Sequence, residues 1–230
     1  MSETHYVPVF SRFTLQEMMD HAPTPWFGIL GFILSRFGLI NTDQGNPAPG
    51  PVAEDLAPFE EIPEDFRSGV NRAVGFMQQH GFEVLSYTHT PSPTVAGAYL
   101  LHQNQQWVAY VACVKDTRPG AAQAYREVYS LLGFSEEGQC YSVTTAPFMQ
   151  VPHVSRIFLR NAAPDKVLST FEKHVQGKNL KSLHNMQEVE EVVDEMSLRS
   201  HRVLVTRGAK KAIAAPAQHL PEEDPDDLQR

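Results

Sequence analysis

The sequence predicts an α+β fold, in which an antiparallel β-meander of five to six strands is packed by flanking helices. Between residues 82 and 145, short segments of alternating apolar residues are separated by turn residues, which is typical of consecutive strands. Apolar residues at helical spacing follow Pro63 and Pro164 on either side of this region. The turns are too short for the crossovers that parallel strands need, so we expect antiparallel pairing.

The N-terminal part begins with a short helix near Leu15, because Thr14 and Glu17 stand at capping-box spacing. Residues 26–40 are the most apolar stretch of the chain, with ten large apolar residues in fifteen and a single charge at Arg36. As a helix this stretch reaches about 22 Å, less than the ~30 Å hydrocarbon core of a bilayer. Three interpretations remain: a buried core helix, an interfacial helix on a membrane, or a docking helix for another subunit.

A linker is predicted at residues 41–62, which are rich in proline and acidic residues and hold no Lys or Arg. This linker divides the chain into four parts. Residues 1–40 are an apolar docking or anchoring segment, residues 63–208 form the α+β domain, and residues 209–230 are a disordered acidic tail. On this division, removal of residues 1–45 is expected to leave a folded domain.

Within the α+β domain a helix is expected from Pro63 to about residue 80, with acidic residues in its first turn. Strands are expected at the following five places: 82–89, 96–102, 107–115, 124–134 and 139–145. Residues 154–160 are a candidate sixth strand. Helices are expected at 164–176 and 186–197, while residues 202–208 fit either a last short strand or a continuation of the second helix.

Charge and cysteine usage exclude several classes of protein. The net charge is −8, and nucleic-acid affinity rests on clustered Lys and Arg, so we expect no nucleic-acid partner. Cys113 and Cys140 lie in expected strands and are predicted to be buried free thiols. The N-terminus has no basic region followed by an apolar run. We therefore expect a location on the cytoplasmic side, either free or peripherally bound to a membrane.

Catalytic motifs are missing from the sequence. It contains no dinucleotide, phosphate-loop, nucleophile-elbow or zinc-protease motif. Its ten histidines show no ligand spacing and no Cys-x-x-Cys accompanies them. We therefore predict no metal, no cofactor and no catalytic residue, and the sequence does not indicate an enzyme.

The first functional hypothesis is a non-enzymatic accessory or interaction subunit that docks in a larger assembly. A protein partner or a membrane surface would bind residues 26–40. The candidate contact residues are the large side chains of this segment and its arginine: Trp26, Phe27, Leu30, Phe32, Ile33, Leu34, Arg36 and Phe37.

The second hypothesis is a small-molecule-binding domain. Six of the seven tyrosines fall within the expected meander, where they could line an aromatic pocket. The candidate ligand-binding residues are Tyr99, Tyr110 and Tyr129. Tyrosine also favours half-buried strand positions for packing alone, so this pattern selects no particular ligand.

Overall fold

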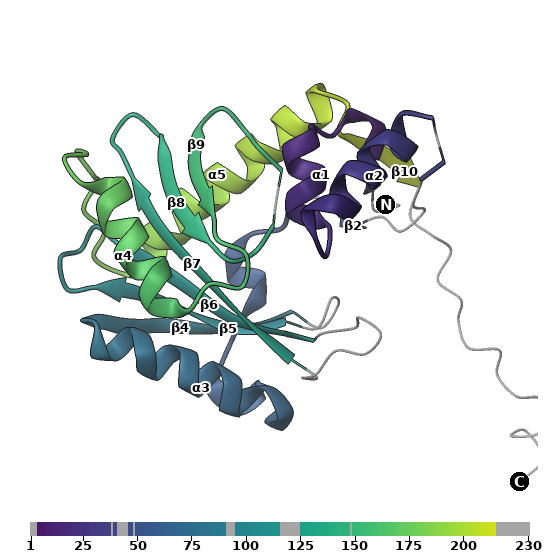
Figure 1. The fold of residues 1–230 in the computed structure, drawn as a ribbon. Coiled ribbons are helices and arrows are strands. Elements are labelled where there is room, and N and C mark those ends of the chain that lie inside the picture. The colour runs from purple at the N-terminus through teal and green to yellow at the C-terminus, as the bar shows by residue number, and fades with distance from the viewer. Residues whose placement is uncertain are drawn as a thin grey trace, which may run out of the picture.

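The computed structural model describes residues 4–37, 39–40, 46–47, 49–90, 95–115, 125–147 and 149–214. In these residues a seven-stranded sheet and a three-stranded sheet are combined with five α-helices (Figure 1). The α+β class is therefore confirmed. The large sheet has the order β3-β4-β5-β6-β7-β8-β9. Its strands are β3 (Leu56–Ala57), β4 (Phe82–Thr90), β5 (Val95–His102), β6 (Val108–Lys115), β7 (Tyr125–Phe134), β8 (Cys140–Thr144) and β9 (Val154–Phe158).

The large sheet is mixed, so the expectation of a purely antiparallel meander is wrong. Strands β3 to β8 pair antiparallel in chain order, but β9 pairs parallel to β8. Cys140 is opposite Val154, and Thr144 is opposite Phe158. The chain that leaves the end of β8 must therefore return to its beginning before β9 starts. A tight turn cannot make this connection, so a longer segment, residues 145–153, joins β8 to β9.

Helices cover both faces of the large sheet (Figure 1). Helices α3 (Glu64–Gln79) and α4 (Pro164–Val175) pack on one face, where Phe66, Val70 and Phe171 enter the main core. Helix α5 (Met186–Thr206) packs on the other face through Val189 and Val193. The residues of each strand alternate between these two cores, as the two-residue period of a strand requires.

The segments predicted as a linker and as a disordered tail both contain regular structure. The predicted linker contains the 3-10 helix η2 (Val52–Asp55) and strand β3, which pairs with β4. The predicted tail begins with strand β10 (Lys210–Ala214). Helix α5 continues to Thr206, so residues 202–208 extend the helix and do not form a strand. Residues 41–45, 48 and 215–230, to which the linker and tail predictions also apply, lie outside the described residues.

The N-terminal residues form a compact unit with the end of the chain. Strand β1 (Thr4–Pro8) lies between β10 and β2 (Asn46–Pro47) in the small sheet. Helices α1 (Leu15–His21) and α2 (Pro25–Arg36) follow, and Figure 1 shows them beside the C-terminal end of α5. Phe13 and Met18 share a third core with Leu204 of α5 and Ala209. We call residues 4–40 together with β10 the N-terminal module.

Gly28 sets the distance between α1 and α2. A Cβ atom added at Gly28 would lie 2.4 Å from the Cα atom of Met19. Backbone atoms cannot yield to such a contact without a shift of one helix. Only glycine fits at this crossing, and Gly28 is therefore buried against α1.

Gly28→Ala should displace α2 and destabilise the protein by about 1–3 kcal/mol, because it overpacks a closed contact. Thermal unfolding and limited proteolysis of residues 24–37 will measure the effect. Gly75→Ala is the matched control, since Gly75 lies within α3 and a Cβ there meets nothing within 4 Å. The control should be neutral or stabilising by up to about 1 kcal/mol, and equal effects of the two substitutions would contradict this account of the crossing.

Candidate functional site

Helix α2 presents its large apolar side chains outward. Trp26 is 72% exposed and Ile33 49%, and Phe37 at the C-cap is 75% exposed. Phe27 and Leu30 are also exposed. At 100° per residue, positions 26, 30, 33 and 37 share one side of the helix. We call Trp26, Phe27, Leu30, Ile33 and Phe37 the α2 face.

The opposite side of α2 carries small residues and packs on α1. Gly28 and Ser35 are the buried residues of the helix. The Ser35 hydroxyl donates to the Phe32 carbonyl at 2.8 Å, so this polar group is satisfied inside the contact. A helix on a globular protein normally turns its apolar stripe inward. Here the arrangement is reversed, because the close approach to α1 admits only glycine and serine.

The predicted contact residues of residues 26–40 therefore divide between the two sides of α2. The five residues of the α2 face are exposed, and Leu34 is half-buried. Phe32 packs against the third core, and the Arg36 guanidinium lies 4.7 Å from the centroid of its ring. Sequence reasoning missed Leu39, which is 70% exposed just beyond the helix, and Leu15 at the start of α1.

Glu17 holds α1, and with it α2, against the rest of the protein. Its side chain is fully buried. One carboxylate oxygen accepts a hydrogen bond from the Thr14 backbone N–H at 2.7 Å, which completes the expected capping box. The other accepts from the Gln150 N–H at 2.7 Å and from the Arg207 guanidinium at 2.8 Å. Burial alone would raise the pKa of Glu17, but these hydrogen bonds outweigh it and hold the pKa below the usual 4.5.

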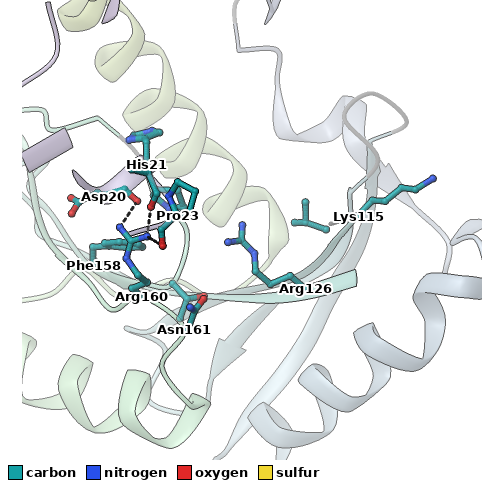
Figure 2. A pocket seen from close by; sticks show the side chains of 12 residues that line it. Asp20, His21, Pro23, Lys115, Arg126, Phe158, Arg160 and Asn161 are labelled. Carbon is teal, nitrogen blue, oxygen red and sulfur yellow. Dashed lines mark hydrogen bonds between the residues drawn. The ribbon is translucent and has the colours of Figure 1, made fainter. Parts of the chain in front are cut away.

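Arg160 clamps the other end of α1. Its guanidinium donates to the carbonyls of Pro23 at 3.1 Å and Asp20 at 3.2 Å, and also to those of Met19 and Ala22. Figure 2 shows this side chain directed at the end of α1 in a cavity of about 260 Å³, with Arg126 reaching the same space from β7. Carbonyls at the C-terminus of a helix attract cations. The guanidinium of Arg160 is therefore used in holding the fold together. The main role of the contacts in this cavity is to fix the end of α1.

The N-terminal module is basic although the whole chain is acidic. Residues 4–40 and 210–214, which form the module, hold four Lys and Arg against two carboxylates, one of which is the buried Glu17. The basic residues of the module are Arg12, Arg36, Lys210 and Lys211, and the adjoining end of α5 adds Arg199, Arg202 and Arg207. Arg12 lies in the 3-10 helix η1 (Phe10–Arg12), which contacts α2. Positive charge thus accompanies the α2 face.

The three tyrosines proposed for a ligand pocket do not lie together. Tyr99 and Tyr110 are cross-strand neighbours with ring centroids 4.7 Å apart, and Tyr99 packs against the core under α5. Tyr129 belongs to the core on the opposite face, under α3. Burial raises the pKa of Tyr99 and of Tyr129. One pocket cannot be lined by all three side chains.

The two cysteines are free thiols in the sheet. Burial raises the pKa of Cys140 to about 12 and also raises the pKa of Cys113. A nucleophilic cysteine needs a low pKa so that its thiolate is populated. Both thiols therefore behave as small apolar side chains.

Metal ligands do not gather in the part of the chain that the structure describes, where no group of three or more His, Cys, Asp or Glu side chains could hold an ion. Over the same residues, every helix is too short or too polar to cross a membrane. Comparison of the chain with protein-family models, with curated proteins and with solved structures finds no match.

Glu17→Gln should destabilise the protein by about 2–3 kcal/mol at pH 7, because the amide removes the negative charge beside Arg207 and replaces one of the two acceptor oxygens with an NH2 donor. Since the folded-state pKa of Glu17 lies below the unfolded value of 4.5, its contribution is present above pH 4.5 and is lost as the pH falls through the folded-state pKa. Urea unfolding between pH 3 and 7 should show a weaker acid dependence in the variant. Glu172→Gln, at an exposed position of α4, is the control and should match the wild type at every pH.

Proposed function

We propose that this protein is a non-enzymatic accessory protein that docks on an anionic membrane surface through the α2 face. The observation that carries the proposal is the outward orientation of Trp26, Phe27, Leu30, Ile33 and Phe37 on a helix whose small residues pack inward. A contiguous apolar surface of this kind on a folded protein marks an interaction site.

The length of α2 supports attachment to the membrane surface. Its twelve residues reach about 18 Å, while a bilayer core is about 30 Å thick. An interfacial helix lies in the plane of the bilayer and buries one apolar face by about 5–10 Å. In α2 that face is already directed away from the protein.

The chemistry of the face and of its surroundings favours lipid over a protein partner. The five side chains of the α2 face offer one hydrogen-bonding group, the indole N–H of Trp26. Protein interfaces combine an apolar centre with a rim of specific polar contacts. Lipid tails have no hydrogen-bonding groups, so a surface that binds them needs no polar rim. Tryptophan suits the membrane–water interface, and Arg12 and Arg36 of the basic N-terminal module suit anionic headgroups.

The α2 face should insert into vesicles that contain phosphatidylserine. In a Trp107→Phe variant of the full chain, Trp26 is the one tryptophan, and its emission should shift to the blue when these vesicles are added. Phenylalanine at position 107 retains a ring against Phe171, which now faces the Trp107 indole edge-on at 5.6 Å. Phosphatidylcholine vesicles and added salt should both give weaker binding, because part of the attraction is electrostatic.

Ile33→Ser in this background should lower the partition coefficient about tenfold, since it removes one buried aliphatic side chain from the interface. Leu198→Ser is the control, because Leu198 is exposed to a similar extent, 43%, but lies on α5. Equal losses in both variants, or no blue shift with any vesicle, would refute the proposal. A dimer in light scattering that Ile33→Ser dissociates would instead assign the α2 face to a second copy of the chain.

A further inference from the structure

We propose that the contact between His201 and the small sheet is an acid-sensitive switch, in which protonation of His201 detaches the small sheet from the end of α5. The small sheet consists of β10, β1 and β2, in that order. It contains no residue of the α2 face, so the inference stands independently of the docking function.

His201 lies near the C-terminal end of α5 and is covered by the small sheet. The ring of Tyr6 in β1 packs edge-on against the imidazole, with the two ring centroids 4.4 Å apart. In the register of β1 and β10, Tyr6 is opposite Ala212 and Pro8 is opposite Lys210. Because side chains of one face recur at every second position, Tyr6 and Lys210 share a face of the sheet. This face is turned toward His201, which lines one cavity together with Lys210.

The imidazole of His201 is buried in its neutral form. Its side chain is 8% exposed, and its Nδ1 atom has no hydrogen-bond partner among the described residues. Burial lowers the pKa of His201 below its usual 6.5, and the nearby Lys210 ammonium lowers this pKa further. A protonated ring in this position would bury a positive charge and an N–H donor without an acceptor, and both are costly.

The titratable groups that face His201 offer no negative charge to a protonated ring. Those on the wall of the shared cavity, which has a volume of about 340 Å³, are Lys210 of β10, Arg156 of β9 and His21 at the end of α1. Strand β1 contributes the ring of Tyr6. On α5 itself, the positions one turn away, 197–198 and 204–205, are uncharged. Among the described residues this wall includes no carboxylate, so a protonated His201 has no ion-pair partner on it.

The small sheet is the side of this contact that can move. Helix α5 is fixed on the large sheet through Val189 and Val193, and α1 is fixed by Glu17 and Arg160. The small sheet has three strands, and β2 has only two residues. A sheet of this size depends on packing against a helix for its stability. Loss of the contact with α5 therefore releases β1 and β10 while the large sheet stays folded.

Detachment is expected to begin as the pH falls below 6.5, the usual pKa of histidine. When the sheet is detached, His201 reaches solvent and binds a proton that the attached form does not bind. One such proton raises the opening equilibrium by up to about tenfold per pH unit. This increase ends once the pH has fallen below the pKa of the attached form. The contribution of Glu17 is lost only below pH 4.5, so the two effects are separated in pH.

Amide hydrogen exchange of the full chain between pH 7 and 5, followed by mass spectrometry, measures the opening. After correction for the intrinsic exchange rate at each pH, β1 and β10 should exchange faster in acid, by up to about tenfold per pH unit. Strands β5 and β6 of the large sheet are the internal control and should stay protected throughout. Unchanged exchange of β1 and β10, or a parallel loss of protection in β5 and β6, would overturn the proposal.

His201→Phe should remove the acid response, because phenylalanine keeps a ring against Tyr6 and binds no proton. Lys210→Met should weaken the response, since removing the neighbouring charge raises the pKa of His201. His21→Gln is the matched control, because His21 lines the same cavity but is exposed. This control should keep the response of the wild type.

A full acid response in His201→Phe, or equal responses in Lys210→Met and His21→Gln, would assign the effect to other groups and refute the switch. If His201→Phe does not fold, the comparison of Lys210→Met with His21→Gln decides the question, because both variants retain His201.

Discussion

The buried carboxylate of Glu17 is the interaction on which the arrangement of the N-terminal module depends. It joins the cap of α1 to the Gln150 backbone and to Arg207, the C-cap of α5. Arg160 fixes the other end of the same helix. A short helix of seven residues has little stability of its own. Its position is set by these polar contacts at both ends, and every element that packs on α1 takes its orientation from them.

The exposed α2 face follows from this constraint. With α1 fixed, the crossing at Gly28 and Met19 determines which side of α2 can approach it. A rotation of α2 that buried Trp26 or Ile33 would place a large side chain where a single Cβ atom does not fit. Burial of each such side chain would be worth about 1.5–3 kcal/mol. The protein does not obtain this stabilisation, and the aromatic side chains of α2 stay exposed, where they can contact another surface.

The helices and strands with a regular apolar period could be predicted from the sequence. The positions of the other elements depend on tertiary contacts. The strands from β4 to β8 and the helices α3 and α4 follow regular periods, so the sequence indicated them. The parallel β9 depends on the path of residues 145–153, and the two-residue β3 is too short to show a period. The apolar composition of residues 26–40 indicated the contact residues, but the inward turn of Phe32 depends on the crossing with α1.

The N-terminal module is part of the fold and cannot be treated as a detachable anchor. Removing residues 1–45 would take away β1, the strand that pairs with both β10 and β2 in the small sheet, and would uncover Leu204 and Ala209. It would also delete Glu17 and leave Arg207 beside an empty buried site. The expectation that residues 63–208 fold alone is therefore at odds with these contacts. A truncation that loses membrane binding would show only that the module is needed for folding. Single substitutions on the outward side of α2 change the docking surface and leave the contacts of Glu17, Arg160 and Gly28 in place.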